Sequence, residues 1–188
     1  MEYLVLGFFT GLSLILAIGA QNIFVIEQGL KRQYVFLVCL VCSVSDLLLI
    51  FLGILLFHFF HQYFNIFIEL ILNILLITFL IYFIYSKIKL IRDKINFSVE
   101  SKSVSRIEIF LKTLGFTYLN AHVYSDTVFF LGNFSKNFIL NEKIFFGLGA
   151  SFASFLFFFL LGYMSTYFSK FAQNDKIWRF INMFIIAF

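Results

Sequence analysis

The chain has 188 residues, of which 62% are hydrophobic, 22% aromatic and only 13% charged. This composition leaves too little polar surface to cover a soluble globule, so we expect an all-α integral membrane protein. The net charge of +4 is explained by membrane topology and predicts no nucleic-acid partner. The chain has no glycine-rich phosphate loop, which excludes an ATP-driven pump encoded on it.

Apolar runs long enough to cross a bilayer core of about 30 Å as helices recur along the chain. Five full runs occupy 3–26, 34–57, 64–85, 109–131 and 144–168, and a shorter run occupies 178–188. The last run rises only about 16 Å as a helix, so we expect it to be a truncated sixth helix. The sequence therefore predicts about six transmembrane helices.

A glycine and two carboxamides interrupt the first run at Gly19, Gln21 and Asn22. The acyl core holds no water that could satisfy a glutamine or an asparagine side chain. We therefore expect these side chains to face the protein interior or a wet cavity.

Asp46 lies near the middle of the second run. A central aspartate costs about 2.5 to 3.5 kcal/mol on insertion scales, so we expect it to face the helix bundle and to bind a cation or a proton. The alternative is a neutral aspartate that holds the bundle together by a hydrogen bond to Ser43, Ser45 or Gln21.

Cys39 and Cys42 form a C-x-x-C pair in the same run, a spacing typical of redox or metal sites. No histidine or further cysteine lies nearby in the sequence, so we expect both thiols to pack as small hydrophobic groups. We expect no metal site and no cofactor. A membrane protein that handles thiols or metals through these two cysteines stays open as an alternative.

Basic residues gather between the third and fourth runs. Residues 87–108 contain Lys87, Lys89, Arg92, Lys94, Lys102 and Arg106. Positive charges in short loops mark the cytoplasmic side, so we expect a basic cytoplasmic loop at 87–108 and the N-terminus outside. This loop separates a first three-helix half, 1–86, from a second, 109–188.

The fourth run contains a second interruption, where Asn120, His122, Tyr124 and Asp126 alternate with small or apolar residues. A regular helix would spread these polar groups around its circumference and expose some of them to lipid. An unwound backbone between Asn120 and Tyr124 would turn them toward a cavity, as in transporters built from discontinuous helices. One break in each half predicts one shared site and two inverted three-helix repeats.

Four segments of the chain together resemble the signatures of the LysE-type amino-acid exporters. They are Gly19-Ala20-Gln21-Asn22, Glu27 to Tyr34, Ser45-Asp46 and Leu119 to Asp126. The order and spacing fit over nearly the whole chain. The family has proline where this chain has Ala20 and Ala121, so Gly19, Ala20 and Ala121 are the expected helix-break positions, although the chain contains no proline.

The resemblance, which is to the lysine/arginine exporter branch, implies a multi-pass transporter of the plasma (inner) membrane and not an enzyme. It implies export of basic amino acids. The carboxylates of Asp46 and Asp126 predict that this export is exchanged for protons, because a carboxylate in a low-dielectric site either pairs with a cation or takes up a proton. The expected partners are therefore the amino acid, protons and lipid, with a homo-oligomer left open. The expected residues that bind substrate or protons are Gln21, Asn22, Asp46, Asn120, His122, Tyr124 and Asp126. A degenerate homologue without transport activity and a pore-forming protein are the remaining alternatives.

Overall fold

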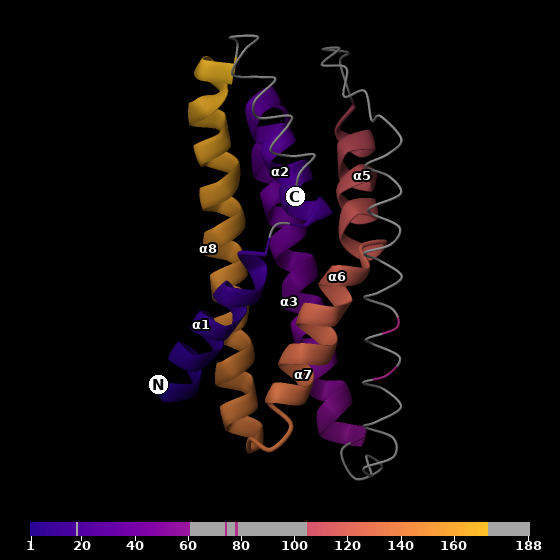
Figure 1. Ribbon diagram of the computed structural model, residues 1–188, viewed down its shortest axis with the longest axis vertical. Coiled ribbons are helices and arrows are strands. Elements are labelled where there is room, and N and C mark those ends of the chain that lie inside the picture. Colours follow the sequence, from indigo (N-terminus) through magenta and orange to yellow (C-terminus); the bar gives the residue numbers. More distant parts are fainter. Residues whose placement is uncertain (18, 61–73, 75–77, 79–104, 173–188) are drawn as a thin grey trace.

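The computed structural model describes residues 1–17, 19–60, 74, 78 and 105–172, and every regular element there is a helix (Figure 1). In chain order these are α1 (Glu2–Ile15), α2 (Ala20–Lys31), α3 (Val35–Phe60), α5 (Arg106–Tyr118), α6 (Ala121–Val123), the π-helix η2 (Tyr124–Phe130), α7 (Leu131–Phe134) and α8 (Leu140–Ala172). The all-α prediction is confirmed for this part of the chain.

Several predicted features lie outside the described residues. They are the run at 178–188, nearly all of the run at 64–85, and the basic loop at 87–108 up to residue 104. The total of six helices and the inverted repeat therefore stay predictions.

Two of the described helices are long and apolar enough to cross a membrane. The candidate spans are Val35–Phe59 in α3, with 25 residues, and Leu140–Ser169 in α8, with 30 residues. Helices α1 and α2 pass the same test together, although they are bent by 80° at the break between them. The described part of the chain thus holds two membrane-spanning helices, or three if the bent pair is one span.

Helix α5 begins at Arg106, three residues before the predicted apolar run. The reason is a side-chain cap: the Ser105 hydroxyl accepts a hydrogen bond from the backbone N–H of Glu108 at 3.2 Å. Such a cap satisfies one of the backbone N–H groups that the first turn leaves without a partner. The helix therefore starts among polar residues that precede the apolar run.

Helix α1 lies against one half of α8, and α2 lies against the other half (Figure 1). The α1–α8 contact is made backbone to backbone. A Cβ atom on Gly7 would lie 2.0 Å from the carbonyl oxygen of Phe146, and one on Gly149 would lie 2.0 Å from that of Leu4. Glycine at both positions therefore allows this close approach, as is usual where helices pack within a membrane.

Most of the buried apolar side chains form two clusters. One contains Phe24, Val25, Val38, Cys39, Cys42, Ile109 and Phe158, and the other contains Ile50, Ile54, Leu131, Phe146 and Ala150. Along α3, Asp46 falls between the members of the first cluster and those of the second. A buried polar layer, which includes Asp46, Asn22 and Asn120, thus lies between two apolar layers.

Candidate functional site

The two helix breaks lie against each other in the structure. The first separates α1 from α2, and the second separates α5 from α6. A Cβ atom on Gly19 of the first break would lie 3.6 Å from Cδ2 of His122 and 3.7 Å from Nδ2 of Asn120. Segments that are far apart in the sequence therefore meet at one place.

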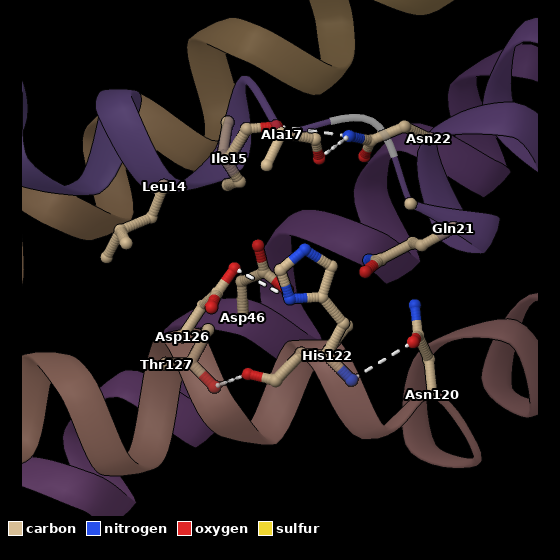
Figure 2. Close-up of a pocket in the computed structure, with 12 residues that line it drawn as sticks. Leu14, Ile15, Ala17, Gln21, Asn22, Asp46, Asn120, His122, Asp126 and Thr127 are labelled. Atoms are coloured by element: carbon tan, nitrogen blue, oxygen red, sulfur yellow. Dashed lines mark hydrogen bonds and ion pairs between the residues drawn. The ribbon is translucent and has the colours of Figure 1, made fainter. Parts of the chain in front are cut away.

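A pocket lies at this meeting point (Figure 2). It is lined by Leu14, Ile15, Ala17, Gly19, Gln21, Asn22, Asp46, Asn120, His122, Val123, Asp126 and Thr127. Six of the seven side chains that the sequence predicts to bind substrate or protons are in this set. The seventh, Tyr124, is half-buried at the start of η2 and does not line the pocket, and Ala20 does not line it either. The side chain of Ala121 lies outside the described part of the chain.

At the first break, the side chain of Asn22 holds the end of α1. Its Nδ2 donates to the carbonyl oxygens of Ile15 at 3.0 Å and Ala17 at 3.1 Å. Carbonyls at a helix C-terminus have no partner within the helix, and here the carboxamide supplies one. The donor group of Asn22 is thus engaged in holding the backbone.

The start of α2 has no such side chain. Its N-cap is Gly19, with an extended backbone at φ −113° and ψ −179°, and in the described part of the chain no side chain caps the first N–H groups. Gly19 and Gln21 both line the pocket. The positive end of the α2 dipole is therefore at the pocket wall, where it favours a negatively charged group.

The second break is shorter than the sequence predicts. The helix is interrupted only at Leu119 and Asn120, and it resumes at Ala121, so the prediction of an unwound backbone as far as Tyr124 is wrong. The physical reason is a cap: Oδ1 of Asn120 accepts a hydrogen bond from the backbone N–H of His122 at 3.2 Å. This bond restarts the helix directly after the break.

The π-helix η2 follows the restarted helix and carries the acidic group of the second break. Nδ1 of His122 lies 3.3 Å from Oδ2 of Asp126, an ion pair when the ring is protonated. The Thr127 hydroxyl donates to the carbonyl oxygen of Val123 at 2.6 Å. Short π-helical segments occur frequently at functional sites, and this one places the Asp126 carboxylate in the same pocket as Asp46.

Asp46 is buried, with 2% of its surface exposed. Its Oδ2 accepts a hydrogen bond from the Ser154 hydroxyl at 2.8 Å, whereas Ser43 donates to the carbonyl oxygen of Cys39. Its Oδ1 has no hydrogen-bond partner among the described residues, and the same holds for Nε2 of Gln21. A buried carboxylate oxygen without a partner is costly, so this pocket is suited to a ligand that supplies a donor or a positive charge.

The sequence did not identify Ser154 as part of the site. It lies 108 residues from Asp46 along the chain. No local sequence signal distinguishes it, because the contact depends on how α3 and α8 pack.

The cavity itself has a volume of about 40 Å³. This is room for about three water molecules and far less than an amino acid occupies. Any larger ligand therefore requires the helices around the pocket to move apart.

Cys39 and Cys42 are free thiols, fully buried in the first apolar cluster. The Cys39 thiol donates to the carbonyl oxygen of Phe158 at 3.2 Å. Within the described ranges, no group of three or more histidine, cysteine or acidic residues is placed to hold a metal ion. These contacts support the packing interpretation of both cysteines.

Comparison with known proteins gives a consistent set of relatives. Residues 12–188 match the LysE type translocator family. The arginine exporter proteins ArgO of Pectobacterium carotovorum and Pectobacterium atrosepticum are 33% and 34% identical, over 95% of this chain and 88% of each relative. Arginine exporter protein ArgO of Salmonella typhimurium is 32% identical over 100% of this chain and 92% of its own length. No solved structure matches the chain.

Proposed function

The chain belongs to the LysE type translocator family, and on this premise we propose that it is a secondary transporter that exports basic amino acids in exchange for protons. The relatives named as arginine exporters support the substrate class. The observation that carries the proposal is the buried Asp46 carboxylate, whose Oδ1 has no partner among the described residues and which lines a pocket at two helix breaks.

The carboxylates account for recognition of the positive charges. Asp46 and Asp126 line the same pocket, and a guanidinium or ammonium group would supply the donors that Oδ1 of Asp46 lacks. Hydrogen bonds between a carboxylate and a guanidinium are charge-assisted and often bidentate. A cationic side chain is therefore the ligand that best satisfies this part of the pocket.

The start of α2 accounts for recognition of the α-carboxylate. Among the described residues no side chain caps its first N–H groups, and its N-cap Gly19 lines the pocket. Half-helix N-termini bind substrate carboxylates in transporters with discontinuous helices. The pocket thus offers a site for each charged end of an amino acid.

The same carboxylates allow exchange with protons. A buried carboxylate is neutralised either by a cation or by a proton, so Asp46 can take up a proton when the cation leaves. Moving one positive charge outward against a negative interior costs about 2.3 kcal/mol per 100 mV. One proton moving inward cancels this electrical cost, and the pH gradient then drives export.

The small cavity implies that transport includes a conformational step. A volume of about 40 Å³ does not admit arginine, so the helices at the breaks must separate before substrate enters. In transporters with a site at discontinuous helices, the site opens to either side largely by rocking of one repeat or helix bundle against the other.

The test is exchange of labelled arginine by the full chain in proteoliposomes. We expect Asp46→Asn to abolish exchange and to leave insertion intact, because a neutral amide costs less to bury than a carboxylate. Asp46→Glu should retain part of the activity. Citrulline, a neutral analogue of arginine, should not compete.

The control for charge removal is Glu108→Gln, since that side chain is 50% exposed and pairs with Lys112 outside the pocket. It should exchange arginine at the wild-type rate. Equal exchange by wild type and Asp46→Asn between about pH 6 and 8 would contradict the proposal, because Asp46 would then be structural.

A further inference from the structure

The hydroxyl groups of α8 differ in what they contact. Ser151, Ser165 and Thr166 each donate to the backbone carbonyl four residues earlier in the same helix, and Ser169 donates to the carbonyl three residues earlier. Ser154 is the exception, since its hydroxyl donates across to α3, to Oδ2 of Asp46 at 2.8 Å. A serine hydroxyl within a helix usually donates to a backbone carbonyl of the same helix, so this contact needs a separate explanation.

We propose that Ser154 is a positioning residue for Asp46: it holds Oδ2 against α8 and leaves Oδ1 as the atom that receives the cation or the proton. This inference rests on the proposed exchange function. The two oxygens have different surroundings, because Oδ2 has a partner and Oδ1 has none among the described residues. Ser154 is fully buried, so no bulk water replaces its hydroxyl.

The Ser154 hydrogen bond also affects when Asp46 is charged. A donor to a carboxylate stabilises its ionised form more than its protonated form. With the hydroxyl present, Asp46 releases its proton more readily, and a cationic substrate then meets a charged carboxylate. Without it, the proton is held to higher pH and competes more strongly with the substrate.

Other titratable groups near Asp46 are the same in wild type and in Ser154 variants. They are His122 on α6, Asp126 on η2, and Cys42 on α3 itself. Helices α1, α2 and α8 contribute no titratable side chain to the pocket lining in the described part of the chain. A change in the titration of Asp46 on removing the hydroxyl can therefore be assigned to that hydroxyl.

The test measures protonation of Asp46 directly and does not depend on transport. The full chain in proteoliposomes is treated with a hydrophobic carbodiimide, which reacts with protonated carboxyl groups, and labelling of the Asp46 peptide is quantified by mass spectrometry over a range of pH. In Ser154→Ala we expect the labelling midpoint to move up by about one pH unit, a tenfold change in the protonation ratio. Protection from labelling should then require roughly ten times more arginine.

The matched control is Ser151→Ala, because Ser151 is on the same helix, is 3% exposed and donates only to the Gly147 carbonyl. Its labelling midpoint should equal that of wild type. Ser154→Cys preserves the side-chain size but supplies only a weak donor, so it should shift in the same direction as Ser154→Ala. If Ser154→Ala fails to fold, the labelling midpoint of Ser154→Cys tests the positioning role instead.

An unchanged labelling midpoint in both Ser154 variants would overturn the positioning role. That result would leave the exchange function intact if wild type exchanges arginine and Asp46→Asn does not. Conversely, a shifted midpoint in a chain that never exchanges arginine would support the contact between Ser154 and Asp46 while contradicting the proposed function.

Discussion

Each of the two helix breaks contains an asparagine, but the two side chains act in opposite senses. Asn22 follows its break and donates backward to the carbonyls at the end of α1. Asn120 lies within its break and accepts from the N–H of His122 at the start of α6. A carboxamide has both a donor and an acceptor, so one residue type can stabilise either end of an interrupted helix.

The difference gives the two breaks different electrostatic character. At the first break the carbonyls are held by Asn22, while no side chain of the described residues caps the N–H groups that follow Gly19. At the second break Asn120 supplies a cap, and the titratable groups are the side chains of His122 and Asp126. The first break is therefore suited to an anionic group, whereas the second brings a carboxylate suited to a cationic one.

The largest expected change in the free energy of unfolding comes from a substitution at the first break. Asn22→Ala leaves the carbonyls of Ile15 and Ala17 without their donor, so we expect the free energy of unfolding to fall by roughly 1 to 3 kcal/mol. Asn120→Ala removes a single bond and should cost about 1 kcal/mol. The measurement is unfolding of the purified protein in a detergent titration, followed by circular dichroism.

The control for these two variants is Asn133→Ala, which removes an exposed asparagine from α7 and should change stability by less than about 0.5 kcal/mol. If Asn22→Ala and Asn120→Ala cost the same as this control, the carboxamides do not hold the breaks.

A smaller effect is expected from restoring proline at both breaks. Ala20 and Ala121 are each the first residue of a helix, α2 and α6. Proline is favoured there because its missing N–H has no partner within the helix. We therefore expect Ala20→Pro and Ala121→Pro to change stability by less than about 1 kcal/mol. Ala150→Pro, in the buried interior of α8, should cost about 3 kcal/mol or more.

Detergent melting of the three proline variants checks this expectation. Loss of folded protein in Ala20→Pro or Ala121→Pro, to the extent seen in Ala150→Pro, would show that the chain runs through that position as a continuous helix.

The smallest effect on stability, with a specific effect on transport, is expected at Gly19. Its Cβ would meet neighbours only at 3.6 Å and beyond, so Gly19→Ser fits. The new hydroxyl would cap the first N–H groups of α2 and raise stability by only about a few tenths of a kcal/mol. Because it would also compete with the substrate α-carboxylate, we expect the KM for arginine to rise severalfold in the proteoliposome assay.

Inhibition by agmatine tests this last prediction more sharply, because agmatine has the guanidinium group of arginine and lacks its carboxylate. Its inhibition of arginine exchange should be unchanged in Gly19→Ser. The control glycine is Gly115, where a Cβ has nothing within 4 Å, so Gly115→Ser should leave both ligands unaffected. An unchanged KM for arginine in Gly19→Ser would mean that the start of α2 does not bind the carboxylate.

Much of the described fold could be predicted because hydropathy is a local property of the sequence. The sequence predicts helices at 34–57 and 144–168. Helix α3 begins one residue later and ends three residues later than predicted, and α8 extends four residues further at each end. Polar residues at bilayer depth had to face inward for lack of water, which is why six predicted side chains line one pocket. The π-helix η2 was not predicted, since its wider turn leaves no repeating pattern in seven residues.

The sequence by itself determined that the chain is helical, that it crosses a membrane, and that Asp46 faces inward. Only the tertiary structure decided which hydroxyl meets this carboxylate. Ser151 and Ser154 are three residues apart, which on a helix is a rise of about 4.5 Å and a rotation of about 300°, so both are on nearly the same face of α8. The packing of α3 against α8 puts Asp46 beside Ser154 and leaves Ser151 bonded to its own helix.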